Sequence, residues 1–169
     1  MSDISPKAII YPNVTLGEGV IVEDFCIIGL PYKGKKNTQT IIGGGSIIRA
    51  GTYIYAGNQI GKNFQTGNKA NIRELNQIGD DVSIGTLTVI EHHISIGNNV
   101  RIHSQVFVPE HSILENDCWI GPNAVLTNAR YPKHASVKDQ LKGPVIGNNA
   151  KIGANTTILP GVEIGKNSL

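Results

Sequence analysis

The chain has 169 residues, a formal net charge of +2, 20 glycines and only 5% aromatic residues. A weak net charge without a basic block argues against nucleic acid as a main partner. The first residues lack a secretory hydrophobic run and no stretch is apolar enough to span a membrane, so we expect a cytoplasmic protein without a membrane partner. The scarcity of aromatic side chains predicts a thin core within a single domain, residues 1–169.

The amino-terminal part starts with a short lead-in, residues 1–9, which is a candidate cap for the structure that follows. An aliphatic residue then recurs every six positions, at Ile10, Leu16, Val22 and Ile28. This phase breaks at residues 30–40, where proline, glycine and three lysines predict a loop excursion. Two interpretations stay open: a solvated loop, or a flap that touches a phosphorylated ligand.

From Ile42 to Leu126 the six-residue period holds without a slip, and Thr66 is its one position that is not aliphatic. A second slot, four residues later, is often small or β-branched, as at Ser46 and Thr52. A period of six fits neither a helix nor a simple alternating strand, and hexapeptide repeats are typical of a parallel β-helix. Each hexad then forms one short strand and one corner, and three hexads close a triangular coil of 18 residues.

The corners of such a coil require sharp turns. Glycine often follows the aliphatic residue, and we expect Gly, Asn or Asp at this place to supply a positive φ. Coils stack at roughly 4.8 Å, the spacing of neighbouring strands. Residues 18 apart in the sequence should therefore form columns along the prism.

A second excursion follows the central block, at about residues 129–143. Its basic residues are Arg130, Lys133, His134, Lys138 and Lys142. The lysines could meet nucleotide phosphates or be solvated, and His134 could reach a neighbouring subunit or be idle. The phase resumes at Ile146, which brings the prediction to about seven coils. The last hexad, at residues 164–169, has no capping element, so we expect either a shortened chain or an end covered by a partner.

Ionisable residues gather in the predicted columns at one corner of the prism. The columns are Glu74, His92, Glu110 and Asn128; Arg73, Glu91, Pro109 and Thr127; and Leu75, His93, His111 and Ala129. The repeat itself needs no carboxylate or imidazole there, and groups stacked this closely couple electrostatically. The alternative is a surface charge ladder with Asn128 as an ordinary turn residue, and His103 and His111 are better explained as solvated or structural.

The repeat pattern as a whole resembles the left-handed β-helix hexapeptide acyltransferases. The left hand rests on this resemblance alone, since the general crossover rule favours the opposite hand. The resemblance implies an all-β fold, a homotrimer with active sites between neighbouring prisms, and acetyl-CoA as co-substrate in the groove between subunits. It also implies that Gly153 and Ala154, at a late corner, let pantetheine approach the backbone, although an ordinary repeat corner explains them equally well.

Two segments are similar to N-acetyltransferases that act on nucleotide-linked amino sugars, notably 3-amino sugars, for surface polysaccharide synthesis. The first is the run with Gly121, Pro122, Thr127, Asn128 and Pro132, in which the matching Asn contacts the sugar amine. The second is Val89–His93, which resembles a segment with a His base. In those enzymes Glu follows the His, whereas His93 follows His92 here, so the usual His–Glu pairing is in doubt.

The implied reaction is attack by a neutral amine on the acetyl-CoA thioester. We expect Asn128 to orient the amine, Glu110 to accept a second hydrogen bond or position the sugar, and His92 to be either the base or a bystander. Substrate-binding roles are expected for Arg73, Glu74, Lys133 and His134, and no metal is expected.

Other functions stay open on the sequence. A gamma-type carbonic anhydrase-like metalloenzyme would use three His, but the positions that correspond here are His93, Ala129 and His134, which leaves one ligand missing. A non-catalytic β-helix scaffold is a further alternative. An O-acetyltransferase acting on a sugar hydroxyl would make a true base, and therefore His92, indispensable.

Overall fold

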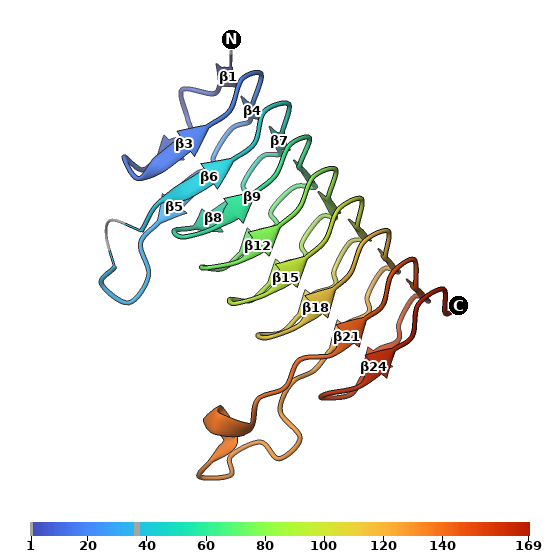
Figure 1. Ribbon diagram of the computed structural model, residues 1–169. Coiled ribbons are helices and arrows are strands. Elements are labelled where there is room, and N and C mark those ends of the chain that lie inside the picture. Colours follow the sequence, from blue (N-terminus) through green and yellow to red (C-terminus); the bar gives the residue numbers. More distant parts are fainter. Residues whose placement is uncertain (1, 36–37) are drawn as a thin grey trace.

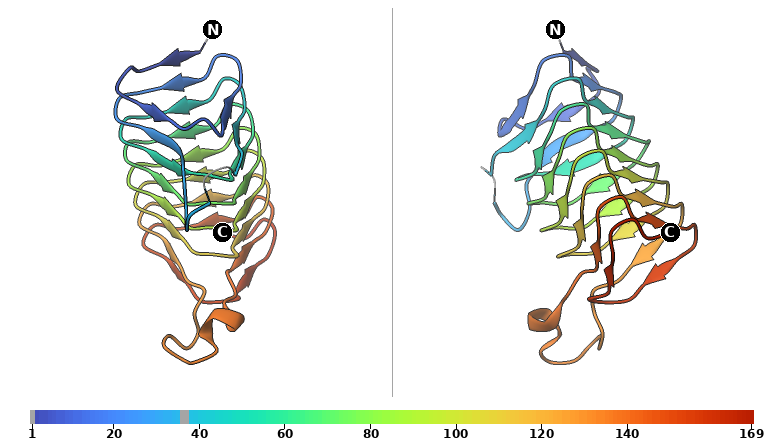
Figure 2. Two further views of the ribbon diagram at one scale, coloured as in Figure 1. Left: turned by 90° about the vertical axis from the view of Figure 1, so that its left-hand side faces the viewer. Right: turned by 45° about the vertical axis from the view of Figure 1, so that its right-hand side comes forward.

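The hexads fold as the period predicts, into short strands that wind around a narrow core. The structure is a computed structural model that describes residues 2–35 and 38–169. Its coils form a long left-handed parallel β-helix, with the amino and carboxyl termini at opposite ends of the stack (Figures 1 and 2). The predicted fold class is confirmed.

Three parallel sheets of eight strands make the faces of the prism. The first sheet contains β1 (Asp3–Ile4), β4 (Ile21–Val22), β7 (Ile47–Ile48), β10 (Gln65–Thr66), β13 (Ser83–Ile84), β16 (Arg101–Ile102), β19 (Trp119–Ile120) and β22 (Lys151–Ile152). The second contains β2 (Ile9–Ile10), β5 (Ile27–Leu30), β8 (Tyr53–Tyr55), β11 (Asn71–Ile72), β14 (Val89–Ile90), β17 (Phe107–Val108), β20 (Val125–Leu126) and β23 (Thr157–Ile158). The third contains β3 (Val14–Leu16), β6 (Thr40–Ile42), β9 (Gln59–Ile60), β12 (Gln77–Ile78), β15 (Ser95–Ile96), β18 (Ile113–Leu114), β21 (Val145–Ile146) and β24 (Glu163–Ile164).

The register of these sheets is the predicted step of 18 residues. Ile72 of β11 pairs with Ile90 of β14 and with Ile54 of β8. Each coil donates backbone N–H groups to the next, as in the 2.9 Å bond from Asn71 N to Thr88 O. Each sheet has one strand more than seven coils require, because residues of the lead-in already form β1 and β2, which pair with β4 and β5.

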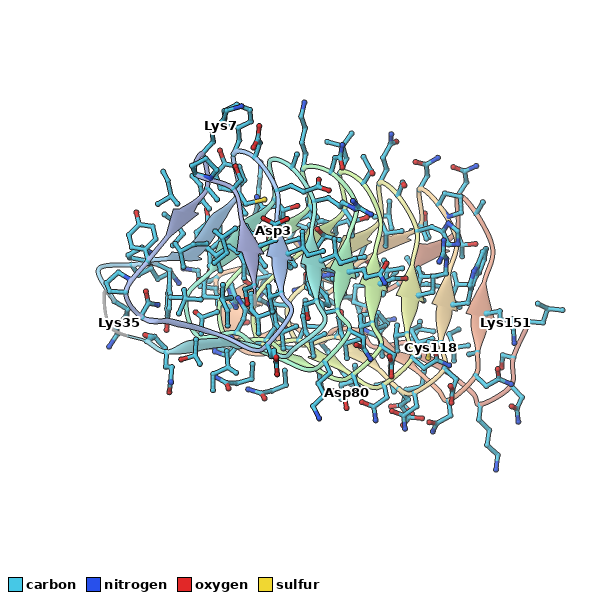
Figure 3. All side chains as sticks on the ribbon, turned by 90° about the horizontal axis from the view of Figure 1, so that it is seen from above. Asp3, Lys7, Lys35, Asp80, Cys118 and Lys151 are labelled. Carbon is cyan, nitrogen blue, oxygen red and sulfur yellow. The ribbon has the colours of Figure 1, made fainter. Side chains whose placement is uncertain are left out.

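The core is the column of periodic side chains. Ile42, Ile48, Ile54 and Ile90 are fully buried, as are the second-slot residues Ser46 and Thr52. Charged side chains such as Lys7, Asp80 and Lys151 project outward from the coils (Figure 3). The exception in the period, Thr66, fits the core because its hydroxyl oxygen accepts a hydrogen bond of 2.9 Å from the backbone N–H of Arg49.

The corners differ from the sequence prediction in one respect. The glycines that directly follow the aliphatic residue do not supply the positive φ. That conformation falls three residues after the aliphatic residue, as at Asp81 (φ 57°) and Asn99 (φ 54°). The glycine after the aliphatic residue is needed for space: a Cβ added at Gly85 would lie under 3.0 Å from backbone atoms of His103 and Ser104 in the next coil.

Both excursions leave the prism at corners, as the phase breaks predicted. The first separates the paired residues Val14 and Thr40 by 26 positions, and Lys36 of its predicted lysines lies outside the described residues. The second separates Ile113 from Val145 by 32 positions and contains the 3₁₀ helix η1 (Val137–Gln140). It projects from the carboxyl-terminal half of the prism (Figure 2), and Lys142 N donates to Asn128 O at its base, at 3.0 Å. Within the described ranges, the structure contains no helix with the length and hydrophobicity of a membrane span.

The role of glycine at the corners gives a direct test of the fold. We expect Gly85→Ala to lower the free energy of unfolding by about 1–3 kcal/mol, because the added methyl group meets backbone that cannot turn away. Gly165→Ala is the matched control, since a Cβ there would approach nothing closer than Ser168 Oγ at 3.7 Å. The check is the urea denaturation midpoint, and equal midpoints for the two variants would contradict this account of the corner glycines.

Candidate active site

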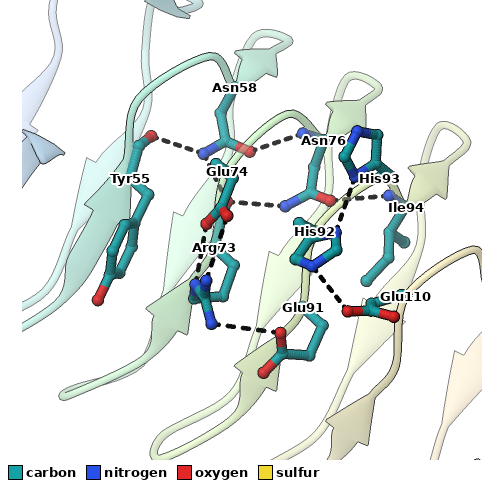
Figure 4. Close-up of polar contacts among 10 residues, drawn as sticks. All are labelled: Tyr55, Asn58, Arg73, Glu74, Asn76, Glu91, His92, His93, Ile94 and Glu110. Atoms are coloured by element: carbon teal, nitrogen blue, oxygen red, sulfur yellow. Dashed lines mark hydrogen bonds and ion pairs between the residues drawn. The ribbon is translucent and has the colours of Figure 1, made fainter. Parts of the chain in front are cut away.

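The predicted columns lie together at the corner between the second and third sheets (Figure 4). Arg73 and Glu74 follow β11, His92 follows β14, Glu110 follows β17 and Asn128 follows β20. The residues that take positive φ at this corner include His93 (56°) and His111 (65°). The side chains therefore come from successive coils and are fixed in height by the backbone register.

Arg73 and Glu74 form a buried ion pair at the amino-terminal end of the corner. The Arg73 Nε and Nη2 atoms donate to the two Glu74 carboxylate oxygens at 2.9 and 3.2 Å, and Nη1 donates to Glu91 Oε2 at 3.4 Å. Burial alone disfavours the charged form of Glu74, which is 2% exposed, but the hydrogen bonds from Arg73 outweigh it and hold the pKa of Glu74 below its usual range. The carboxylate of Glu74 thus faces Arg73 and not solvent.

Two buried asparagines support this end of the corner from inside. Asn58 and Asn76 are fully buried, and Asn58 Oδ1 accepts from the backbone N–H of Asn76 at 3.0 Å. Asn76 Oδ1 accepts in turn from the backbone N–H of Ile94 at 2.8 Å, while its amide nitrogen donates to Arg73 O at 2.9 Å. The sequence analysis missed these residues, and the available signal was an Asn in the small second slot of two hexads 18 residues apart.

The centre of the corner is a line of acid and imidazole groups. His92 Nε2 lies 2.7 Å from Glu110 Oε1, and His92 Nδ1 lies 2.7 Å from His93 Nδ1. The His93 ring is also 5.9 Å from the His111 ring, measured between centroids. His93 and His111 are exposed, whereas His92 and Glu110 are half-buried. The sequence placed His93 in the neighbouring column and did not predict its contact with His92.

Burial lowers the pKa of His93, and the charges of His92 and His111 lower it further. His93 is therefore mainly neutral at neutral pH and keeps a lone pair on one ring nitrogen. A neutral imidazole at an exposed position is suited to accept a proton.

Asn128 closes the line at its carboxyl-terminal end. Its Nδ2 atom is 3.5 Å from Glu110 Oε2 and 3.4 Å from Glu110 O, at the long limit of a hydrogen bond. The neighbouring Thr127 hydroxyl donates to Ile158 O at 2.8 Å and ties the turn to the next coil. Asn128, Glu110 and His92, the residues predicted to be catalytic, are thus in one contiguous group.

The remaining predicted site residues lie elsewhere on the chain. Lys133 and His134 are exposed on the second excursion, where His134 Nδ1 is 2.9 Å from Ser136 Oγ. Gly153 and Ala154 lie at a different corner, between β22 and β23, and Gly153 lines a hollow of about 450 Å³ with Trp119 and Lys151. Within one described chain, no hydrogen bond or ion pair links these four residues to His92, His93 or Glu110.

Comparison with known proteins agrees with this architecture. The family described as bacterial transferase hexapeptide (six repeats) matches residues 77–110 and 143–169. The chain carries the bacterial transferase hexapeptide repeat. A curated relative of this hexapeptide-repeat protein, the bifunctional protein GlmU of Methanococcus vannielii, is 37% identical over 67 residues. That match covers 34% of this chain and only 16% of the relative.

Among solved structures, an LpxA described as a UDP-N-acetylglucosamine acyltransferase from Bacteroides fragilis is similar, with a TM-score of 0.54 and 22% identity. The likeness covers 91% of this chain and 59% of that one, and it shows the fold. A mutant of GDP-perosamine N-acetyltransferase from Caulobacter crescentus, in complex with CoA and GDP-perosamine, has a TM-score of 0.46 and 16% identity over 94% of this chain and 52% of that one. The second likeness is too loose to bear on function.

One group at the corner of this hexapeptide-repeat protein has the spacing of metal ligands. In the described ranges, the donor atoms of Glu91, His92 and Glu110 lie within 4.8 Å of one another. The positive guanidinium of Arg73 already lies against Glu91, at 3.4 Å, and would repel a cation bound there. The set also offers a single imidazole, unlike the three His of the carbonic anhydrase alternative, so we assign no metal site to it.

The buried ion pair gives a testable prediction for stability. Arg73→Ala should lower the free energy of unfolding by about 3 kcal/mol, because it leaves the carboxylate of Glu74 buried without a partner. Adding Glu74→Gln to that variant should restore much of the loss. The control is Arg49→Ala, which breaks an exposed pair with Glu23 and should cost less than about 1 kcal/mol.

The measurement is chemical denaturation at neutral pH and in acid. Since the folded-state pKa of Glu74 is depressed, the contribution of the pair is present above the ordinary glutamate range and is lost as pH falls through the folded-state pKa. A single variant as stable as wild type would show that Arg73 does not hold Glu74 in its charged form.

Proposed function

We propose that this protein transfers an acetyl group from acetyl-CoA to the amine of a nucleotide-linked amino sugar used in surface polysaccharide synthesis. The observation that carries this proposal is the contiguous line of Asn128, Glu110, His92 and His93 at one corner of the β-helix. An imidazole backed by a carboxylate, beside an amide, provides both a proton acceptor and a hydrogen-bond acceptor for an amine. The hexapeptide repeat and the resemblance of residues 89–93 and 121–132 support the same reaction.

The chemistry asks three things of the corner. The amine must be held with its lone pair toward the thioester carbonyl, it must lose a proton, and the thiolate of CoA must leave. Because the amide nitrogen of Asn128 is turned toward Glu110, its carbonyl oxygen is available on the other side to accept an N–H of the amine. The imidazole line beside it takes the proton as the carbon–nitrogen bond forms.

The substrate-binding roles predicted from the sequence need one adjustment. Glu74 is buried against Arg73, so in this proposal it acts by holding the guanidinium and does not touch the sugar nucleotide. Arg73, whose side chain is 30% exposed and whose guanidinium lies 5.1 Å from the Tyr55 ring centre, is the group that meets the ligand. Lys133 and His134 would approach from the second excursion of a neighbouring copy.

A homotrimer fits the outer face of the second sheet, which adjoins the corner. Its outward side chains are largely apolar and only partly buried: Ile9, Ile27, Tyr53, Val89, Phe107 and Val125. The corresponding row of the first sheet is more polar, with Gln65, Ser83 and Arg101. In the proposed trimer a second copy covers the apolar row, and acetyl-CoA lies in the groove between copies, where Gly153 and Ala154 border the pantetheine.

The proposal is tested by thiol release from acetyl-CoA with a panel of UDP-, dTDP- and GDP-linked amino sugars. We expect release with at least one sugar, and a 10²–10⁴-fold lower turnover for Asn128→Ala with an unchanged thermal midpoint, because a corner side chain outside the core is removed. The control is Asn123→Ala, at an exposed corner that does not touch the site. Wild-type turnover in Asn128→Ala would remove Asn128 from the site, and no release or binding of acetyl-CoA would leave a scaffold or a metalloenzyme.

A further inference from the structure

We propose that Glu110, His92 and His93 form a proton relay whose basic end is Nε2 of His93, so that His93 is the catalytic base and His92 and Glu110 are its positioning residues. This inference rests on the proposed acetyl transfer and names the atom that takes the proton. It differs from the expectation drawn from the resemblance, in which the base is His92.

The proton arrangement follows from counting hydrogens along the line. His92 Nε2 lies 2.7 Å from the carboxylate of Glu110, and an ionised carboxylate only accepts, so Nε2 of His92 carries a hydrogen. In neutral His92 the other nitrogen, Nδ1, then has the lone pair. Nδ1 of His92 lies 2.7 Å from Nδ1 of His93, a contact that holds one hydrogen, which His93 must supply.

The consequence is a fixed tautomer for His93. With its hydrogen on Nδ1, neutral His93 has its lone pair on Nε2, the nitrogen that does not face His92. His93 is exposed while His92 is half-buried, with a side chain 16% exposed. The lone pair that can reach a substrate amine is therefore on His93, and both nitrogens of His92 are already engaged.

The backbone holds His93 in place for this role. Its φ of 56° is in the left-handed region, which a residue with a Cβ adopts only when its surroundings fix it. The next residue, Ile94, is buried, and its N–H donates to the buried side chain of Asn76 at 2.8 Å. Asn76 and the core thus set the direction of the His93 side chain from below.

The charges around the line favour a mainly neutral His93 that accepts a proton during the reaction. His92 and His111 face its ring, while Glu74 and Glu110 act from the neighbouring column. The Arg73–Glu91 pair lies one column further away. Once Nε2 takes a proton, the Nδ1 hydrogen of His93 can pass to Nδ1 of His92, which places the positive charge beside the carboxylate of Glu110, where it is stabilised.

The step balances without any further reactant. The lone pair of the amine forms a bond to the thioester carbon, and the carbon–sulfur bond breaks with its electron pair on sulfur. The proton lost by nitrogen goes to Nε2 of His93, and the relay returns it to the thiolate to give free CoA. The net change is amide and thiol from amine and thioester.

Kinetics of three variants test the assignment of the base. We expect His93→Ala to lower kcat by 10²–10⁴-fold, the usual scale for loss of a general base. Glu110→Gln should lower kcat less and shift the acid limb of the kcat profile to lower pH by about one unit or more, because the charged relay loses its carboxylate. His111→Ala, which faces the same ring from outside the relay, is the control and should stay within about threefold of wild type.

Nitrogen NMR of histidine-labelled full-length protein tests the proton positions without a substrate. We expect the Nδ1–H tautomer at His93 and the Nε2–H tautomer at His92, assigned with the single His variants. The Nε2–H tautomer at His93 would overturn the relay, as would a His93→Ala variant with near wild-type kcat. If these tautomers are found but no amino sugar is acetylated, the proposed function fails and the proton arrangement stands.

Discussion

The structure depends on the hydrogen bonds that each coil makes to the next at a fixed step of 18 residues. Examples are Asn71 N to Thr88 O and Gln65 N to Val82 O, both at 2.9 Å. In a thin prism these bonds satisfy nearly all polar backbone groups, while the core adds one aliphatic side chain per hexad. A register shift by one residue would turn the whole aliphatic column outward, so the pattern fixes the stacking strongly. The same register decides which functional side chains become neighbours.

The corner is the one place where this architecture can hold ionisable groups at little cost. Core positions accept only apolar or fully bonded side chains, as the hydrogen bond to Thr66 and the Asn58–Asn76 ladder show. At the corner, side chains from successive coils stack at the spacing of strands, close enough for direct hydrogen bonds between coils. His92 and Glu110 are such a pair, and Arg73 and Glu91 are another. A rigid solenoid thus supplies preorganised geometry from strictly local sequence rules.

Much of this could be predicted from the sequence, because a period of six determines both the fold class and the columns. The grouping of His92, Glu110 and Asn128 followed from their 18-residue separation alone. The contact of His93 with His92 could not, since it depends on ring rotation at a residue with positive φ. Glu74 was predicted to touch substrate, but its neighbour Arg73 folds back onto it, a side-chain choice that the repeat does not encode. The corner glycines were predicted for their φ, whereas their function is to admit the next coil.

The central claim is that chemistry takes place at His93 on this corner, in a groove covered by a second copy. A crystal structure with CoA and an amino-sugar nucleotide bound tests it most directly. The account predicts that the amine lies about 3–3.5 Å from His93 Nε2 and near Asn128, with the CoA sulfur adjacent and a second copy against the row of Val89 and Phe107. Ligands bound at another corner, or an amine that contacts His92 with His93 turned away, would contradict it.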